Sequence, residues 1–191
     1  MSMTIRNVRL VGVLAFLVMM VTAGLVEAAS FKENLIPVPG DANVLILINA
    51  AQARESAYAR QLRAEHGGTP IMDQSILSGP NVERIVTAAR LDLATGEPVW
   101  ELGVVSTTNE PNLPRLAKYL GGRLDTIDGR GALQLPINAY IVLLGPKIVG
   151  IKSPADRQAI ASWAYEATTR SEVSVSAYLK AMAVFPEQTG T

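Results

Sequence analysis

Four charged side chains around one glycine-rich turn are the closest group in the sequence that could do acid–base chemistry. Asp125 and Asp128 are flanked by Arg123 and Arg130. Paired carboxylates can transfer protons or bind calcium. The spacing is not that of an EF-hand, and exposed turns commonly carry aspartate. We expect a solvated turn; the alternative is a hydrolase in which Asp125, Asp128 or Glu101 faces a second carboxylate across about 5–10 Å.

Metal and nucleophile chemistry is restricted by a single histidine and by the absence of cysteine. Without cysteine the chain has no disulfide, thiolate zinc site, iron–sulfur cluster or thiol nucleophile, and no cysteine-linked lipid anchor. One histidine cannot form a two-histidine metal site. His66 precedes Gly67 and Gly68 at the end of a predicted helix, where an imidazole can cap the last carbonyl groups. We expect this capping role; catalysis or ligand binding by His66 is the alternative.

The glycine and aromatic motifs point to structure rather than to cofactors. No window has the Gly-x-x-x-x-Gly-Lys-Ser/Thr pattern of a phosphate loop. Gly129 and Gly131 lack the third glycine of a dinucleotide-binding motif, so we expect a tight turn. Trp100, Trp163 and the five tyrosines are scattered, which favours core positions over a stacking surface. The sequence therefore assigns no catalytic, cofactor-binding or metal-ligating residue.

Residues 1–28 have the three parts of a secretory signal peptide. Arg6 and Arg9 give a positive start, and residues 10–26 form an apolar stretch without charge. The segment ends in Val26-Glu27-Ala28 and is followed by Ala29, and cleavage after Ala28 places Val26 and Ala28 at the two recognised positions. We therefore expect export to the periplasm or the extracellular space.

Two alternatives to cleavage after Ala28 stay open. Cleavage after Ala29 fits nearly as well. Residues 10–26 could also be retained as a membrane anchor, although 17 residues is at the short limit for a membrane span and Gly24 interrupts the helix. Contact with a membrane is expected only in that second case.

Composition indicates one ordinary folded domain. The chain has 191 residues, of which 49% are hydrophobic and 18% charged, enough apolar material for a core. The net charge is zero, and it is −1 without residues 1–28. No run of lysine and arginine stands out, so we expect no drive toward nucleic acid or anionic lipid.

Hydrophobic patterning predicts strand, helix and hairpin in the first half of the chain. Residues 44–48 are continuously apolar, which favours a central strand buried on both faces. Asn49 is placed to cap a helix over 50–66. Residues 82–91 and 99–106 predict a hairpin.

In the second half, an apolar stripe at i, i+3, i+4 and i+7 predicts a helix over 113–120. Ser153 as N-cap and Pro154 at the first position predict another helix reaching residue 168, and a last helix is expected over 175–184. Four short strands are expected at 124–127, 132–135, 139–144 and 148–151.

Two segments are expected to lack regular structure. Residues 29–42 are a lead-in in which Pro37, Pro39 and Gly40 oppose helix and strand. The 69–81 loop is longer than a connection requires. Its apolar side chains are expected to pack on the domain, and contact with a partner is the alternative.

The element order predicts an α+β fold. Strand, helix, two strands, helix and strand match a ferredoxin-like β-α-β-β-α-β core, with a mainly antiparallel sheet and helices on one face, followed by a hairpin and C-terminal helices. The expected organisation is a signal peptide (1–28), the lead-in (29–42), an α+β domain (43–170) and a C-terminal helix and tail (171–191). The last segment could instead begin a truncated second half.

Three stretches resemble a group of uncharacterised exported bacterial proteins. Residues 39–43, Pro-Gly-Asp-Ala-Asn, form a Pro-x-Asp-Ala box directly before the first strand, and residues 152–158 and 176–179 are similar to the same group. The resemblance implies an envelope location and no established activity. It therefore assigns no functional residue.

Three functional hypotheses follow. The first is an exported, non-enzymatic envelope protein that binds an unidentified envelope partner or ligand or has a structural role. The second is the exported carboxylate-dependent hydrolase. The third is a signal-anchored accessory subunit of a membrane complex.

Overall fold

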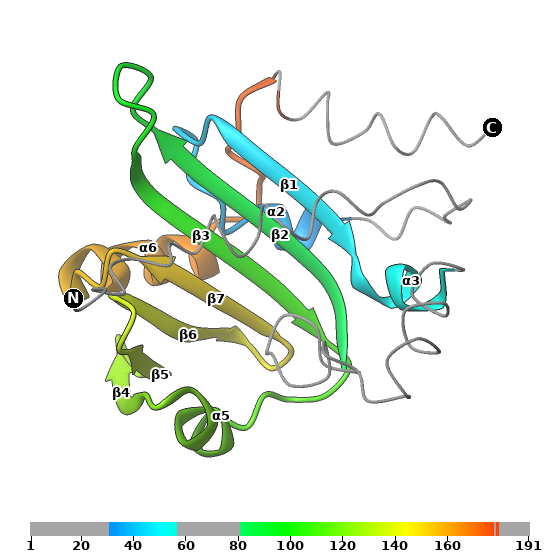
Figure 1. The fold of residues 1–191 in the computed structure, drawn as a ribbon, viewed down its shortest axis with the longest axis vertical. Coiled ribbons are helices and arrows are strands. Elements are labelled where there is room, and N and C mark those ends of the chain that lie inside the picture. The colour runs from blue at the N-terminus through cyan, green and yellow to red at the C-terminus, as the bar shows by residue number, and fades with distance from the viewer. Residues whose placement is uncertain (1–30, 57–80, 178, 180–191) are drawn as a thin grey trace, which may run out of the picture.

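The computed structural model describes residues 31–56, 81–177 and 179 (Figure 1). They form one seven-stranded sheet in which every pairing is antiparallel, together with four helices. The predicted α+β class and antiparallel sheet are confirmed. The signal peptide, His66, residues 69–80 of the long loop and most of the last helix lie outside the described residues.

The strands follow the order β1-β2-β3-β7-β6-β5-β4 across the sheet. Their bounds are β1 Val44–Asn49, β2 Val82–Leu91, β3 Pro98–Thr107, β4 Arg123–Ile127, β5 Arg130–Leu135, β6 Ala139–Gly145 and β7 Ile148–Ser153. The helices are α2 Lys32–Leu35, α3 Ala50–Glu55, α5 Leu113–Leu120 and α6 Arg157–Thr169.

Local turn chemistry forms the predicted hairpins. Asp128 and Gly129 both have positive φ, 50° and 73°, as the two-residue turn between β4 and β5 requires. Between β2 and β3, the Asp92 carboxylate accepts a hydrogen bond of 2.8 Å from the Ala94 backbone N–H, and Gly96 has φ 69°. These turns set the register of each pair.

The strand order is not that of a ferredoxin-like domain. In that fold the first strand is central and the second is at an edge, whereas here β1 is at one edge of the sheet and pairs with β2. The prediction of a central, fully buried strand is therefore wrong. Its apolar run has another reason: Leu45 and Leu47 pack against one core and Ile46 and Ile48 against another, so both faces are partly covered.

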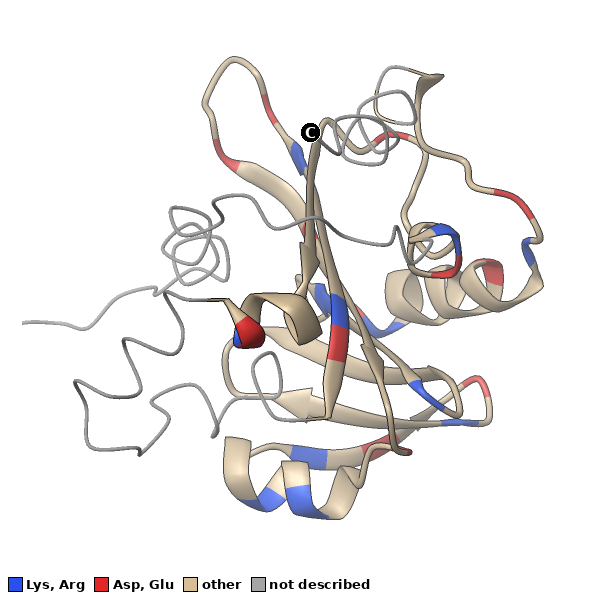
Figure 2. Cartoon of the chain, turned by 90° about the vertical axis from the view of Figure 1, so that its right-hand side faces the viewer, with Lys and Arg blue, Asp and Glu red and all other residues tan. Residues whose placement is uncertain are grey.

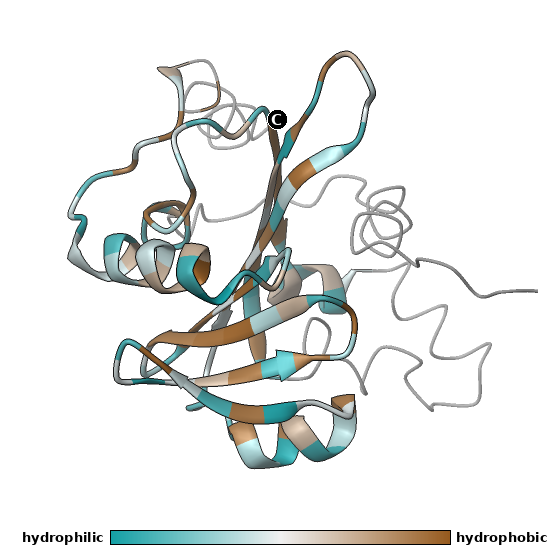
Figure 3. Cartoon of the chain, turned by 90° about the vertical axis from the view of Figure 1, so that its left-hand side faces the viewer, coloured by the Kyte–Doolittle hydropathy of each residue, from teal (hydrophilic) through white to brown (hydrophobic). Residues whose placement is uncertain are grey.

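Helices cover both faces of the sheet, not one as predicted. On β6, Tyr140 and Val142 belong to the core formed with α6, whereas Ala139 and Ile141 belong to the core formed with α5. Successive side chains on a strand point to opposite faces, so the two helices lie on opposite sides. Figure 3 shows the strands running between them, with α6 above and α5 below.

Helix α6 begins three residues later than predicted. The Asp156 carboxylate accepts hydrogen bonds from the backbone N–H groups of Gln158 and Ala159, at 2.9 and 3.0 Å, and is therefore the N-cap. Ser153 is instead the last residue of β7. The predicted core face is confirmed, because Ile160, Trp163 and Ala164 are buried.

The predicted lead-in is part of the fold. It contains the short helix α2, and its Asn34 and Val38 are fully buried. The Asn34 amide donates to the Ser106 hydroxyl of β3 at 2.6 Å, and that hydroxyl donates back to the Asn34 carbonyl at 2.9 Å. This reciprocal pair attaches α2 to the sheet.

The predicted helix after β1 is shorter in the described residues. Asn49 caps α3 as expected, accepting a hydrogen bond of 3.1 Å from the Gln52 N–H. The helix ends at Glu55 because Ser56 is extended, with ψ 152°. Residues 57–66 of the prediction lie outside the described part of the chain.

Candidate functional site

The α6 face of the sheet holds the candidate site, and Trp163 is at its centre. A Cβ atom added to Gly150 of β7 would lie 3.0 Å from Cζ2 of Trp163 and closer still to Cη2. The indole N–H donates to the Pro37 carbonyl at 2.8 Å. Trp163 therefore joins α6 to the strand below it and to the N-terminal segment.

Lys152 lies on the same face of β7 as Gly150, two residues away. Its Nζ is 5.4 Å from the centroid of the Trp163 ring, within the range of a cation–π interaction. Burial lowers the pKa of the Lys152 amine below its ordinary value, while the negative charges of Asp41, Glu166 and Asp156 act in the opposite direction.

Asp41, from the Pro-x-Asp-Ala box, completes this group. Its carboxylate accepts a hydrogen bond of 2.7 Å from Arg90 of β2 and one of 3.5 Å from the indole of Trp100 of β3. We refer to the set as the Lys152 cluster. It consists of Asp41, Arg90, Trp100, Lys152 and Trp163.

The next residues of the box have a structural role. Asn43 forms two hydrogen bonds of 2.8 Å with the backbone of Leu91, one as donor and one as acceptor. Its own backbone N–H donates to the Ala89 carbonyl at 3.0 Å. These hydrogen bonds therefore hold the residues directly before β1 against the end of β2.

A second group, the Asp125 cluster, joins β4 to the start of α6 and consists of Asp125, Tyr140 and Arg157. The Asp125 carboxylate accepts hydrogen bonds of 2.7 Å from the Thr126 N–H, 3.1 Å from the Tyr140 hydroxyl and 3.4 Å from Arg157 Nε. Arg157 also donates to the Thr126 carbonyl at 2.7 Å.

These contacts shift the pKa values of Asp125 and Tyr140 in opposite directions. Both shifts are those expected when a phenol donates a hydrogen bond to a carboxylate. The pKa of Asp125 lies below its ordinary value, first because of the Thr126 N–H and then because of the Arg157 guanidinium. The pKa of the Tyr140 phenol is raised by burial and by its hydrogen bond to the Asp125 carboxylate. Asp125 is therefore held as an anion and Tyr140 as a neutral donor.

The other residues singled out in the sequence do not converge with Asp125. Asp128 binds Arg130 at 2.6 Å within the turn, and Arg130 also donates to Thr168 of α6 at 2.6 Å. Arg123 donates to Gln134 of β5 at 2.8 Å.

Glu101 is separated from Asp125 by the sheet. It is buried on β3 and alternates with Leu102, which packs on the α6 side, so Glu101 belongs to the other face. The facing pair of carboxylates required for a glycosidase-like site is not formed by Asp125 with Glu101.

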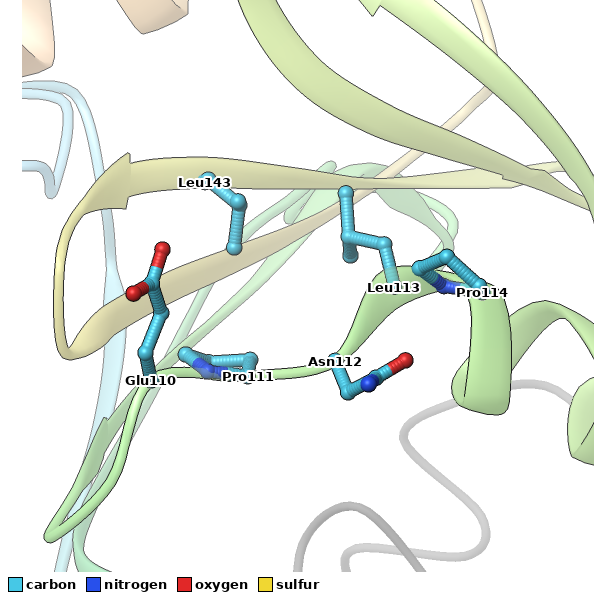
Figure 4. A pocket seen from close by; sticks show the side chains of 6 residues that line it. All are labelled: Glu110, Pro111, Asn112, Leu113, Pro114 and Leu143. Atoms are coloured by element: carbon cyan, nitrogen blue, oxygen red, sulfur yellow. The ribbon is translucent and has the colours of Figure 1, made fainter.

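Two open hollows lie at the end of the sheet. The first has a volume of about 440 Å³ between residues 110–114 and β6, and Figure 4 shows Leu113 and Leu143 projecting toward it. The second, of about 400 Å³, shares Glu110 and Leu143 and adds Arg130. Neither is lined by the Lys152 or the Asp125 cluster.

Across the described ranges, no group of three or more histidine, cysteine, aspartate or glutamate side chains is arranged to hold a metal ion. The helices found in those same ranges are all too short or too polar to cross a membrane. Neither finding bears on residues 1–30 or on His66.

Sequence reasoning missed Lys152, Tyr140 and Asp41 as members of polar clusters. Lys152 belonged to one of the stretches that resemble exported proteins, and it alternates with Gly150 on a short apolar strand. Asp41 was noticed only as part of a motif. No protein-family model, curated protein or solved structure matches this chain.

Proposed function

We propose that this chain is an exported envelope protein with a binding or structural role rather than a catalytic one. The export part rests on Arg6 and Arg9, on the apolar residues 10–26, and on Val26 and Ala28 at the two positions recognised for cleavage, which together resemble a cleavable signal. Its expected location is the periplasm or the extracellular space.

The observation that carries the non-catalytic part is how the polar side chains of the candidate site are used. Asp41 is bound by Arg90 and Trp100, and Asp125 by Arg157, Tyr140 and the Thr126 N–H. These contacts join segments that are far apart in the sequence. Carboxylates whose oxygens are already bound within the fold stabilise the structure, and they support a binding or structural role for the protein.

Export is tested by fusing the full chain to a reporter enzyme that becomes active only outside the cytoplasm. We expect reporter activity from the fusion and its loss when Arg6 and Arg9 are both replaced by glutamate, because a positive start is needed for orientation. Reporter activity confined to the cytoplasm would contradict the proposal.

The non-catalytic role is tested by complementing cells that lack the protein. The variants Asp125→Asn, Asp128→Asn and Glu101→Gln should each restore the parental envelope phenotype when they accumulate to the parental level. Loss of complementation by one of them, with the protein present and folded, would favour the carboxylate-dependent hydrolase.

A further inference from the structure

The sheet of the described residues has two edge strands, β1 and β4, and they differ in how their backbone groups are used. An edge strand presents N–H and C=O groups to which a further strand can bind. We propose that β1 pairs with β1 of a second copy of this chain, antiparallel and about a two-fold axis, so that the two sheets become continuous. This pairing does not depend on the proposed export.

Side chains protect the edge formed by β4. The Thr126 N–H donates to the Asp125 carboxylate at 2.7 Å, and the Thr126 carbonyl accepts a hydrogen bond of 2.7 Å from Arg157. Two of the five residues of β4, Arg123 and Asp125, are charged. Occupied backbone groups and charged side chains both oppose the addition of a strand at this edge.

The edge formed by β1 has no such protection in the described part of the chain. There the backbone of residues 44–48 pairs with β2 alone, without a bulge, and no side chain is bonded to it. The sequence has neither charge nor proline between Asp41 and Arg54. Figure 2 is turned so that the side of Figure 1 on which β1 lies faces the viewer, and β1 is tan, without blue or red.

The side chains of β1 are only partly covered, on both faces of the sheet. Leu45 and Leu47 pack at the margin of the core on the α6 side, and Ile46 packs at the margin of the core next to α3. All three are half-buried. A strand added beside β1 would cover apolar surface on both faces at once, which would stabilise the pairing.

The sequence of β1 is complementary to itself. A two-fold axis perpendicular to the sheet keeps the corresponding faces of the two copies on the same side. An axis through Ile46 places the two copies of this residue opposite each other. It also pairs Leu45 with Leu47 of the second copy, and Val44 with Ile48 of the second copy. Every pair in the centre of the interface is therefore aliphatic.

The charges that flank β1 favour the same arrangement. Asp41 before the strand and Arg54 after it have opposite signs. The antiparallel pair brings the Asp41 end of one copy toward the Arg54 end of the other, whereas a parallel pair would bring like charges together. Because β4 is protected, assembly should stop at two copies.

The test measures the mass of the purified full chain by sedimentation equilibrium over a range of concentrations. We expect the parent to associate reversibly to two copies. Ile46→Lys should lower the association constant about tenfold or more, because two ammonium groups would face each other and apolar contact would be lost. The matched control, Leu124→Lys, changes a 51% exposed side chain on β4 and should associate as the parent does.

A mixture of two variants makes the test specific to a second copy. Ile46→Glu alone should weaken association as Ile46→Lys does. An equimolar mixture of the two variants should restore it, because an ammonium group would then face a carboxylate. Circular dichroism verifies that each variant is folded, and residues 10–26 are the same in all of them, so the differences report on β1.

Hydrogen exchange tests the parent without any substitution. Protection of the backbone N–H groups of residues 44–48 should increase with protein concentration, because their outer groups become paired. Protection of β4 should not change.

Four results would overturn the proposal. The first is a parental mass of one chain at every concentration, and the second is protection of β1 that does not depend on concentration. The third is an effect of Leu124→Lys as large as that of Ile46→Lys. The fourth is a mixture of folded Ile46→Lys and Ile46→Glu chains that stays monomeric. A monomeric parent carrying a co-purified peptide that Ile46→Lys releases would assign β1 to a strand of another protein. Because all these measurements use purified protein, their failure is distinct from failure of the export test.

Discussion

The ring of Trp163 occupies the space that a side chain at Gly150 would fill. This contact lets α6 approach β7 closely, and it places the indole N–H within 2.8 Å of the Pro37 carbonyl. The ring is also the platform under the Lys152 amine. One glycine on a strand therefore permits three segments of the chain to meet.

Gly150→Ala should destabilise the protein by about 1–3 kcal/mol, because overpacking forces a neighbouring side chain or the backbone to move. The free energy of unfolding, from urea denaturation, measures the effect. Gly103→Ala is the matched control on β3, since its added Cβ would meet nothing nearer than the Ile151 Cβ at 3.8 Å. Equal effects of the two substitutions would contradict the close contact with Trp163.

Asp156→Ala should lower the free energy of unfolding by about 0.5–2 kcal/mol, because two backbone N–H groups at the start of α6 lose their acceptor. Ser153→Ala should have a smaller effect, since Ser153 ends β7 and does not cap the helix. Thermal denaturation of both variants compares them. A larger loss from Ser153→Ala would restore the capping role predicted from the sequence.

Removing one partner of the hydrogen-bonded pair Asn34 and Ser106 should lower the free energy of unfolding. Ser106→Ala leaves the fully buried Asn34 amide without its hydroxyl partner, and we expect a loss of about 1–3 kcal/mol in the free energy of unfolding. A double-mutant cycle with Asn34→Ala isolates the interaction. Additive single effects would show that the two side chains are not coupled.

The Asp125 cluster should make the free energy of unfolding depend on pH in the acidic range. A carboxylate whose pKa is lowered in the folded state adds stability at pH values above its unfolded pKa of about 3.9. That contribution is lost as the pH falls through the folded pKa of Asp125. Asp125→Asn should therefore be less stable than the parent at neutral pH, and the difference should shrink as the pH falls through this range.

Urea denaturation between neutral pH and pH 2 checks this prediction. Asp92→Asn, in the exposed β2–β3 turn, is the control for a change of one carboxylate. A difference between parent and Asp125→Asn that stays constant over the whole pH range would contradict the assignment of Asp125 as a carboxylate bound by donors.

The features of the fold that could be predicted are those determined by residues close together in the sequence. Asp128 and Gly129 specify their turn, Asn49 and Asn112 cap the helices that follow them, and the apolar stripe of α5 gives its buried face. The strand order was not predictable, because a continuous apolar run such as β1 fits an edge strand covered on both faces as well as a central strand.

The candidate site depends on contacts between distant residues. Trp163 meets Pro37 across 126 positions, Asp41 meets Arg90 across 49, and Arg157 meets Asp125 across 32. No local pattern encodes such pairs.

The most direct measurement for the account as a whole is the N-terminal sequence of the protein isolated from fractionated cells. We expect the chain in the envelope or extracellular fraction to begin at Ala29, with residues 1–28 removed. A chain that retains Met1 and is recovered from the cytosol would contradict the proposal of an exported protein.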